Sequence, residues 1–410
     1  MRELLHRDAQ TIIRHSIQAV LPDEAVRRAL EGRTFPGKVV LVAAGKAAWQ
    51  MAKAAADVIF IEKGVVITKY GHIGGVLENL YCFEAGHPVP DENSFHATHA
   101  ALELVSGLAE NDTVLFLLSG GGSALFEQPL ISGEELQDIT SQLLACGANI
   151  VQINTIRKRL SAVKGGRFAQ RCAPARVFSI VLSDIVGDPL DMIASGPAYA
   201  DTSTCADALS IAEKYHLRLS DPARKLLLQE TPKELHNVET VITGSVRELC
   251  SAAARCCREL DYEPMVLTDR LSCEAREAGS FLGAIAKSHS KCSRPLAFLA
   301  GGETVVHLTG KGLGGRNQEL ALAAAAHITG LEHTLVFSLG SDGTDGPTDA
   351  AGGIVDGTTL MRLEEKGFNI HDVLAENDAY HALKAVDGLI FTGPTGTNVN
   401  DISVVLIQAT

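Results

Sequence analysis

A glycine-dense segment, GGETVVHLTGKGLGG at residues 301–315, leads into an alanine- and leucine-rich helix whose first turn carries Arg316. The exposed N–H groups at a helix N-terminus already carry partial positive charge, so an arginine there is unfavourable by itself. An anion bound by the N–H groups and the guanidinium together would remove this conflict. The segment therefore predicts an anion-binding site at Arg316, with a phosphorylated ligand as the leading candidate.

A second anion site is predicted at the motif SGGGS, which follows the apolar segment 114–118. Consecutive glycines let backbone N–H groups converge on a phosphate without obstruction by side chains. A tight strand-to-helix turn would explain the same glycines and stays open as the alternative. The residues expected to bind ATP or phosphate here are Ser119, Gly120, Gly121, Gly122 and Ser123.

Lys46 follows the buried strand predicted at 39–43 and stands next to Gly45. A lysine at a strand end can meet a phosphate as a compact point charge, although a snorkelling surface lysine would give the same pattern. The upstream glycine and the following Ser or Thr of a Walker A motif are both missing. A phosphotransferase with this sequence is therefore not of the P-loop type.

Residues 154–171 concentrate Lys and Arg in one short stretch of an acidic protein. A solvated helix face explains most of these charges at least as well as ligand binding does. Lys164, which precedes two glycines, is the best candidate for a phosphate contact, and Arg159 is assigned to substrate binding.

Two acidic loops, SDIVGDPLD and SDGTDGPTD, follow apolar strands. Carboxylates at strand ends can bind Mg²⁺ or accept a proton, and the second loop does not match an EF-hand. Asp188 precedes Pro189 and so also fits a helix N-cap. His87, in AGHPVPD, is interpreted as a loop histidine rather than a base. The candidates for metal binding or general-base catalysis are Asp184, Asp188, Asp342 and Asp345.

The closing loop, TGPTGTNVND at 392–401, lies between two apolar strands. Its compact polar groups could bind substrate or phosphate oxygens, with Asp401 bracing the loop from its base. The predicted substrate-binding residues are Thr395, Thr397 and Asn398. A well-formed turn without a binding role stays open, since these residue types are common in turns.

The motif GKGLGG at 310–315 matches the GxGxxG pattern of dinucleotide-binding loops. The acidic partner expected about 20 residues later is missing from the right place. With 38 glycines in the chain, a chance match is easy. A dinucleotide site, a structural turn and another kind of anion site therefore all stay open.

Continuous apolar segments alternate with helical ones, which predicts an α/β fold with a largely parallel, two-sided sheet. A polar helical region near 205–236 separates two such series. We therefore predict one domain over 1–236 and a second, with a mixed sheet, over 237–410. The predicted strands are 39–43, 64–68, 80–83, 114–118, 177–182, 238–243, 263–268, 296–300, 335–339, 389–392 and 404–407.

The net charge of −13 over 410 residues argues against a general nucleic-acid binder, which needs a basic face. The nine cysteines are scattered without a CxxC motif, which favours free thiols in a reducing cytoplasm. Neither a signal-peptide core nor an apolar run of membrane-spanning length is found. We expect a cytoplasmic protein that binds small molecules rather than nucleic acid or membrane. A homo-oligomer is left open.

Several of these strings, in the same order along the chain, resemble the glycerate 2-kinase family, whose C-terminal part is called the MOFRL domain. They span nearly the whole sequence, so chance is a poor explanation. The matching strings are AAGKAA at 43–48, AGHPVPD at 85–91, LLSGGGSALF at 117–126, NTIRKRLSAVKGGRFA at 154–169, LSDIVGDPLDMIASGP at 182–197, GGETVVHLTGKGLGGRNQELALA at 301–323, GSDGTDGPTDAAGG at 340–353 and TGPTGTNVND at 392–401.

The resemblance implies ATP-dependent phosphorylation of D-glycerate at its 2-hydroxyl, giving 2-phosphoglycerate and ADP, with Mg²⁺ or another divalent cation. It also implies two three-layer α/β/α domains, the first with a Rossmann-like sheet, and an active site in the cleft between them. Lys46 and Arg316 match the residues most associated with catalysis in the family. An NAD(P)H-dependent hydroxypyruvate reductase and a non-catalytic sugar-acid sensor are the alternatives.

Overall fold

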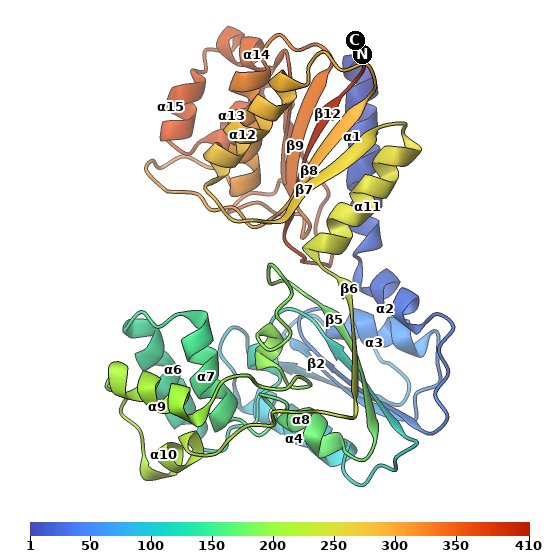
Figure 1. Ribbon diagram of the computed structural model, residues 1–410, viewed down its shortest axis with the longest axis vertical. Coiled ribbons are helices and arrows are strands. Elements are labelled where there is room, and N and C mark those ends of the chain that lie inside the picture. Colours follow the sequence, from blue (N-terminus) through green and yellow to red (C-terminus); the bar gives the residue numbers. More distant parts are fainter. The chain divides into compact units, whose positions relative to one another are not determined.

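The computed structural model describes residues 1–410, and the chain divides into two compact α/β units (Figure 1). The first-sheet unit comprises Pro22–Ser183 and Asp188–Thr243. The second-sheet unit comprises Met1–Leu21, Asp184–Gly187 and Gly244–Thr410. Each unit is built around its own six-stranded sheet.

The strands of the first sheet are β1 (Val39–Ala44), β2 (Lys63–Lys69), β3 (Leu80–Ala85), β4 (Thr113–Leu118), β5 (Arg176–Leu182) and β6 (Val238–Gly244). Their order is β3-β2-β1-β4-β5-β6, and the pairs from β3 across to β5 are parallel. The chain builds outward from β1 to β3 and then returns to add β4 on the other side of β1. The carboxyl ends of β1 and β4 therefore form the topological switch point, where open α/β sheets bind ligands.

Helices cover both faces of the first sheet because successive strand residues point to opposite sides. Leu115 belongs to the apolar cluster under the helices α2 and α3, whereas the next residue, Phe116, stacks with Phe126 and Phe168. The helices of this unit are α2 (Pro22–Leu30), α3 (Ala48–Ala56), α4 (Glu92–Leu104), α5 (Gly122–Leu125), α6 (Gly133–Ala145), α7 (Ile150–Leu160), α8 (Arg167–Cys172), the 3₁₀ turn η1 (Ile193–Ser195), α9 (Cys205–Lys214) and α10 (Asp221–Leu227). The polar region of the sequence forms α9 and α10, which share an apolar cluster with α6 and α7.

The second sheet is mixed, as predicted. Its strands are β7 (Glu263–Leu271), β8 (Leu296–Gly302), β9 (Thr334–Gly340), β10 (Gly352–Asp356), β11 (Leu389–Ile390) and β12 (Asp401–Ile407). Their order is β11-β10-β9-β12-β8-β7, with β7 and β8 parallel and every other pair antiparallel. The ends of β8 and β9 and the start of β12 meet at one edge, because Asp401 pairs with Gly302 and Gly340.

Two helical layers sandwich the second sheet. The helices are α1 (Arg2–Ala19), α11 (Val246–Glu259), α12 (Ala275–Ser288), α13 (Arg316–Ile328), α14 (Thr359–Glu365), α15 (Ile370–Ala375) and α16 (Ala379–Ala385). Leu335 and Phe337 pack with α1 and α11, while Val336 packs with α12 and α13 on the opposite face. Figure 1 shows α1 beside α11 on one side of the strands.

The division of the chain differs from the predicted boundary at 236/237 in three segments: the short loop segment Asp184–Gly187, which belongs to the second-sheet unit, and two segments of regular structure. Helix α1 belongs to the second-sheet unit, since its buried Leu5 and Ile12 join the cluster under α11. Strand β6 is the edge strand of the first sheet rather than the start of the second. The sequence pattern identifies these segments as helix and strand, but periodicity contains no information about which sheet they join.

Strand β10 is not among the predicted strands, because its two leading glycines weaken the apolar pattern. The structure explains the first of them. A Cβ on Gly352 would lie 2.0 Å from the carbonyl oxygen of Ser338, so the close approach of β9 requires glycine there.

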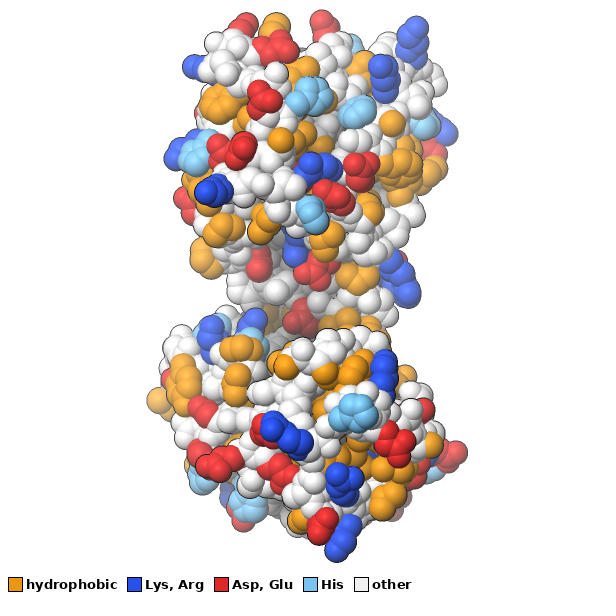
Figure 2. Space-filling model, turned by 90° about the vertical axis from the view of Figure 1, so that its left-hand side faces the viewer, with side chains coloured by type: hydrophobic (Ala, Val, Ile, Leu, Met, Phe, Trp, Pro, Cys, Tyr) orange, Lys and Arg blue, Asp and Glu red, His pale blue; other side chains and the backbone are white.

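No helix has both the length and the apolar content needed to cross a membrane. On the face shown in Figure 2, Lys and Arg side chains are interspersed with Asp and Glu, so this face carries no continuous basic surface.

Candidate active site

Lys46 and the SGGGS motif meet at the switch point of the first sheet. The Lys46 N–H donates a 2.9 Å hydrogen bond to the carbonyl oxygen of Gly120. The Ser119 hydroxyl accepts a 3.1 Å bond from the Ala47 N–H. Gly45 has a φ of +131°, and a Cβ there would lie 2.1 Å from the Ser119 hydroxyl oxygen. The glycine before Lys46 therefore permits the two loops to touch.

His87 also lies at this switch point, which the sequence interpretation did not foresee. A Cβ on Gly121 would lie 3.0 Å from His87 Cδ2 and 3.3 Å from Lys46 Cγ, so the imidazole and the lysine flank the same glycine. Burial lowers the pKa of His87, and the nearby charges of Lys46 and Lys69 lower it further. The imidazole is therefore neutral at pH 7 and can accept a proton.

Lys164 supports the glycine loop from inside the protein. Its side chain is fully buried, and its ammonium donates to the carbonyl oxygens of Ser123 at 2.8 Å and Phe126 at 3.1 Å. The buried carboxylate of Glu127 lies 3.4 Å away. Burial lowers the pKa of Lys164 to about 8. The expected phosphate contact is therefore corrected: Lys164 positions the loop that carries Ser123.

Arg159 is likewise internal rather than a substrate ligand. Its guanidinium is fully buried and donates to the carbonyl oxygens of Thr155 and Ser203, at 3.0 and 2.9 Å. It also lies 3.7 Å from the buried carboxylate of Asp201. The sequence cannot distinguish such an internal counter-ion from a ligand-binding arginine, because the charge is the same and only burial differs.

The loop after β5 packs against the glycine loop in an unusual backbone conformation. Ala194 and Ser195 have φ values of +50° and +62°, a region that non-glycine residues rarely adopt. The Ser195 hydroxyl donates to Asn154 Oδ1 at 2.9 Å and lies 3.4 Å from the Ser123 hydroxyl. Backbone strain of this kind concentrates at ligand-binding sites.

Asp188 lies in the same loop, and its interpretation as a helix N-cap is wrong. Its φ is +52°, and no helix begins at Pro189. Its Oδ1 atom is buried without a hydrogen-bond partner. A buried, acceptor-only oxygen without a donor suits a cation ligand. Asp184 follows the end of β5 after one intervening residue, Ser183, so both predicted carboxylates follow the same strand end.

Arg316 lies at the edge of the second sheet where β8 ends and β12 begins. Its Nε and Nη2 atoms donate to the two carboxylate oxygens of Asp401 at 2.6 and 3.0 Å, and Nη1 donates to Glu303 at 2.7 Å. Burial opposes the charge, but the bonds to Asp401 and Glu303 raise the pKa of Arg316 overall. About a third of the side chain, 32%, remains exposed. The guanidinium is thus fixed in direction while part of it faces solvent.

The anion at the N-terminus of α13 is part of the protein itself. The carboxylate of Asp345 accepts bonds from the N–H groups of Asn317 at 3.1 Å and Gln318 at 2.8 Å. Gly315 permits this approach, since a Cβ there would lie 2.4 Å from Asp345 Oδ1. This corrects two expectations: the helix terminus is occupied by an internal carboxylate, and Asp345 is a cap rather than a metal ligand or base.

Asp342 is the more accessible carboxylate of that loop. It accepts a 3.0 Å bond from the Thr344 N–H and is only partly buried. A Cβ on Gly340 would lie 3.3 Å from Asp342 Oδ1 and 3.4 Å from Asp401 Oδ1. Asp342 therefore lies beside the carboxylate that holds Arg316.

The glycines of GKGLGG serve packing rather than a dinucleotide turn. Strand β8 ends at Gly302, well before the motif, so the strand–turn–helix geometry of a dinucleotide site is missing. A Cβ on Gly310 would lie 2.2 Å from Glu376 Cα, and the Gly312 N–H donates to the Glu376 carbonyl oxygen at 2.8 Å. These contacts support the structural alternative.

The closing loop uses its hydroxyls internally. Thr395 donates to the carbonyl oxygen of Ser341 at 2.6 Å, and Thr397 is buried and donates to that of Val20 at 2.8 Å. The Asn398 amide oxygen accepts a 3.3 Å bond from the Asn400 N–H. The turn interpretation is therefore favoured for Thr397, which ties the loop to the end of α1, while Thr395 and Asn398 keep exposed surface.

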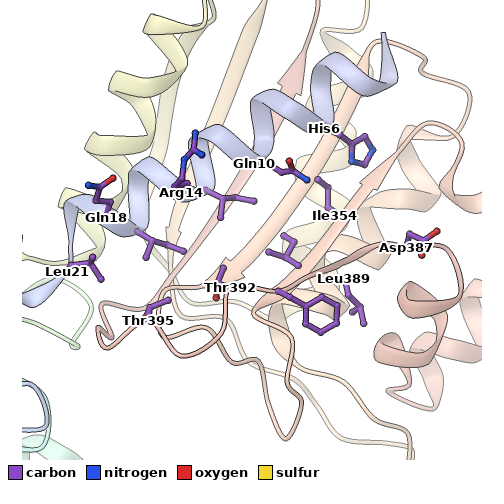
Figure 3. A pocket seen from close by; sticks show the side chains of 14 residues that line it. His6, Gln10, Arg14, Gln18, Leu21, Ile354, Asp387, Leu389, Thr392 and Thr395 are labelled. Carbon is purple, nitrogen blue, oxygen red and sulfur yellow. The ribbon is translucent and has the colours of Figure 1, made fainter. Parts of the chain in front are cut away.

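A separate groove of about 690 Å³ runs between α1 and the end of β11 (Figure 3). Figure 3 shows polar side chains along this side of α1, among them His6, Gln10 and Arg14. Of the predicted site residues, the groove contains Thr395 but neither Lys46 nor Arg316.

Known proteins match this chain over nearly its whole length. The profile of a domain of unknown function, DUF4147, matches residues 8–228, and that of the MOFRL family matches residues 296–401. The D-glycerate 2-kinase of Thermotoga maritima is 54% identical, with 99% of each chain covered. A putative hydroxypyruvate reductase of Agrobacterium vitis is 39% identical over 90% of this chain and 87% of its own. The crystal structure of a glycerate kinase from Thermotoga maritima matches with a TM-score of 0.94 and 53% identity, covering 99% of this chain and 100% of that one.

Proposed function

This chain belongs to the glycerate 2-kinase family, and we propose that it transfers the γ-phosphoryl group of ATP to the 2-hydroxyl of D-glycerate, giving 2-phosphoglycerate and ADP. The observation that carries the proposal is the meeting of Lys46, His87 and the SGGGS loop at the switch point of a parallel sheet. A lysine, a neutral imidazole and a glycine-rich backbone supply charge neutralisation, a proton acceptor and N–H donors. Phosphoryl transfer requires these groups and little covalent chemistry from the protein.

Lys46 is proposed to bind the transferring phosphoryl group, with the SGGGS backbone as its uncharged complement. The hydrogen bond from the Lys46 N–H to the Gly120 carbonyl oxygen fixes the backbone of Lys46 to the loop, so the lysine and the loop N–H groups start from one preorganised backbone. Preorganised donors stabilise developing charge without reorganising during the reaction. Lys164 and Ser195 support the SGGGS loop at Ser123. The Lys164 ammonium donates to the Ser123 carbonyl oxygen, and the Ser195 hydroxyl lies next to the Ser123 hydroxyl.

His87 is proposed as the group that accepts the proton of the glycerate hydroxyl. Its lowered pKa keeps the imidazole neutral, as a general base must be. The flanking position of His87 and Lys46 at Gly121 supports this assignment, because the hydroxyl that loses its proton must lie next to the phosphoryl group that it attacks.

Arg316 is proposed to stabilise negative charge on the phosphoryl group or the glycerate carboxylate. The bidentate contact with Asp401 and the bond to Glu303 hold the guanidinium rigidly, and its remaining N–H groups can bind an anion.

Asp188 in the first-sheet unit and Asp342 in the second-sheet unit are separately the carboxylates best suited to bind a divalent cation such as the Mg²⁺ that is expected to accompany ATP. The unpartnered buried oxygen of Asp188 fits a cation, and Asp342 offers a partly exposed carboxylate. When bound, the ion neutralises phosphate charge. Asp345 does not fit, since both of its oxygens accept N–H groups of α13.

We place the enzyme in the cytoplasm, as the reducing compartment in which free thiols persist. All nine cysteines are free in the structure.

The test measures ATP consumption with D-glycerate and Mg²⁺, alongside NAD(P)H oxidation with hydroxypyruvate. We expect turnover only in the kinase assay, with kcat lowered about 10²–10³-fold or more in Lys46→Ala and Arg316→Ala. The matched controls are Lys53→Ala and Arg27→Ala, which remove charges from exposed ion pairs in the first-sheet unit. NADH oxidation without ATP turnover would instead support the reductase, and glycerate binding without either turnover would support the sensor.

A further inference from the structure

A cluster of potential metal ligands lies where α1 packs against α11, within the second-sheet unit. His15 comes from α1, and Cys256 and Glu259 come from the last turn of α11. One ligand atom from each side chain lies within 4.8 Å of the other two. The closest pair is Cys256 Sγ and His15 Nδ1, at 3.4 Å. None of these residues belongs to the proposed catalytic machinery.

Helix periodicity explains why these side chains converge. Cys256 and Glu259 are three residues apart on α11 and so project from the same side of the helix. The apolar stripe of α1, including Leu5 and Ile12, is buried against α11, and His15 lies at the solvent edge of that contact. Cys256 is buried between the two helices, whereas His15 and Glu259 are exposed.

We propose that this cluster binds Zn²⁺, with Cys256 Sγ, His15 Nδ1 and a Glu259 carboxylate oxygen as protein ligands and water in the fourth position. Thiolate, imidazole and carboxylate are the three ligand types that zinc combines in proteins. Zn–S and Zn–N bonds of about 2.3 and 2.1 Å at a tetrahedral angle would place S and N about 3.6 Å apart. The observed distance of 3.4 Å between Cys256 Sγ and His15 Nδ1 is close to this value, so these two ligands need almost no movement to bind the ion.

Zinc binding would replace a hydrogen bond by metal coordination. Without metal, the Cys256 thiol and the His15 ring share one proton between sulfur and Nδ1. With metal, the thiol proton passes to solvent and the ion takes its place between the two atoms. The ion would then bridge α1 to α11 and stabilise the docking of α1, without altering the residues proposed for catalysis.

The probes are Zn²⁺ and Co²⁺ added to full-length protein previously treated with a chelator. We expect one Zn²⁺ per chain, a thiolate-to-cobalt charge-transfer absorption with Co²⁺, and a rise in Tm with Zn²⁺. His15→Gln, Cys256→Ser and Glu259→Gln should each weaken Zn²⁺ binding at least about tenfold, and Cys256→Ser should abolish the charge-transfer band. Cys273→Ser is the matched control, because it removes an exposed thiol elsewhere in the same unit.

His15 and Glu259 are exposed, so His15→Gln and Glu259→Gln should have the Tm of wild type when no metal is present. A loss of Zn²⁺ binding in these variants can therefore be separated from a loss of folding. Absence of stoichiometric Zn²⁺ binding would overturn the proposal and leave a simple thiol–imidazole hydrogen bond. The same conclusion would follow if binding persisted in His15→Gln and Cys256→Ser but was lost in Cys273→Ser.

Discussion

The His87 side chain lies against Gly121 although the two residues belong to loops after different strands. If His87 accepts the hydroxyl proton, His87→Gln should lower kcat by about 10²–10⁴-fold. The wild-type kcat should fall only at acidic pH, below the ordinary histidine value of about 6.5, because burial and the nearby lysines lower the pKa of His87. A pH profile of kcat measures both effects. His99→Gln, an exposed histidine on α4, is the control, and an unchanged acid limb in His87→Gln would assign the proton elsewhere.

Lys164 and Glu127 form a fully buried ion pair beneath the SGGGS loop. Replacing Lys164 by Met leaves the Glu127 carboxylate in the interior with only Arg157, at 3.6 Å, as a cationic neighbour. We expect the free energy of unfolding to fall by about 3–5 kcal/mol. Urea denaturation measures this loss, and Lys164→Met/Glu127→Gln should recover part of it. A Lys164→Met enzyme of normal stability with a raised KM for ATP would instead restore the phosphate-binding role.

Single residues show where sequence reasoning succeeds and where it stops. Lys46 and Arg316 can be proposed as ligand-binding residues from sequence, because a charge next to a strand or helix end is a local pattern; their roles stay predictions. Lys164 and Arg159 have the same local pattern, yet burial makes them internal counter-ions. The position of His87 could not be predicted from sequence, because it depends on contact with Gly121 in a distant loop, and its role is a proposal.

At the scale of elements, the N-terminus of α13 is capped by a carboxylate from the loop after β9. Burial raises the pKa of Asp345 from 3.8 to about 6, against the opposing effect of its N–H donors. Compared with the unfolded chain, the folded state therefore favours the protonated form of Asp345. The contribution of Asp345 to the free energy of unfolding is fully present below pH 3.8 and is lost as the pH rises through about 6.

Asp345→Asn removes this titration while keeping the size of the cap. The difference in free energy of unfolding between wild type and Asp345→Asn should therefore decline from pH 4 to pH 7, as measured by urea denaturation at several pH values. A difference that stays constant over this range would show that Asp345 has an ordinary pKa.

Most elements follow from the alternation of apolar and helical segments, since continuous apolar runs mark strands buried on both faces. Strand β10 is the exception, because Gly352 reflects contact with β9 rather than local propensity. The anion site predicted at α13 has the right electrostatics, but the sequence could not show that Asp345 would fill it.

At the scale of the whole molecule, the assignment of α1 to the second-sheet unit makes a testable statement. Ile12 is fully buried among α11 and second-sheet residues, whereas Gln10 is exposed. Ile12→Ala should cost about 2–5 kcal/mol of stability, and Gln10→Ala should change it by less than about 0.5 kcal/mol. Hydrogen exchange should increase in α11 and β9 but not in β1 or β4. Faster exchange in β1 and β4 would instead place α1 with the first sheet.

The membership of α1 has a consequence for biosynthesis. Helix α1 precedes the other elements of the structure along the chain, whereas its partners α11, β9 and β12 begin only at residues 246, 334 and 401. At a translation rate of about 5–20 residues per second, the apolar stripe of α1 stays without its packing partners for on the order of tens of seconds. The first-sheet unit, whose two segments both end before residue 244, can fold during that interval. During this interval the nascent chain therefore carries the amphipathic helix α1 without a partner, on the N-terminal side of a folded first-sheet unit. The second-sheet unit can be completed only when α1 packs onto α11 and the sheet, which are synthesised later.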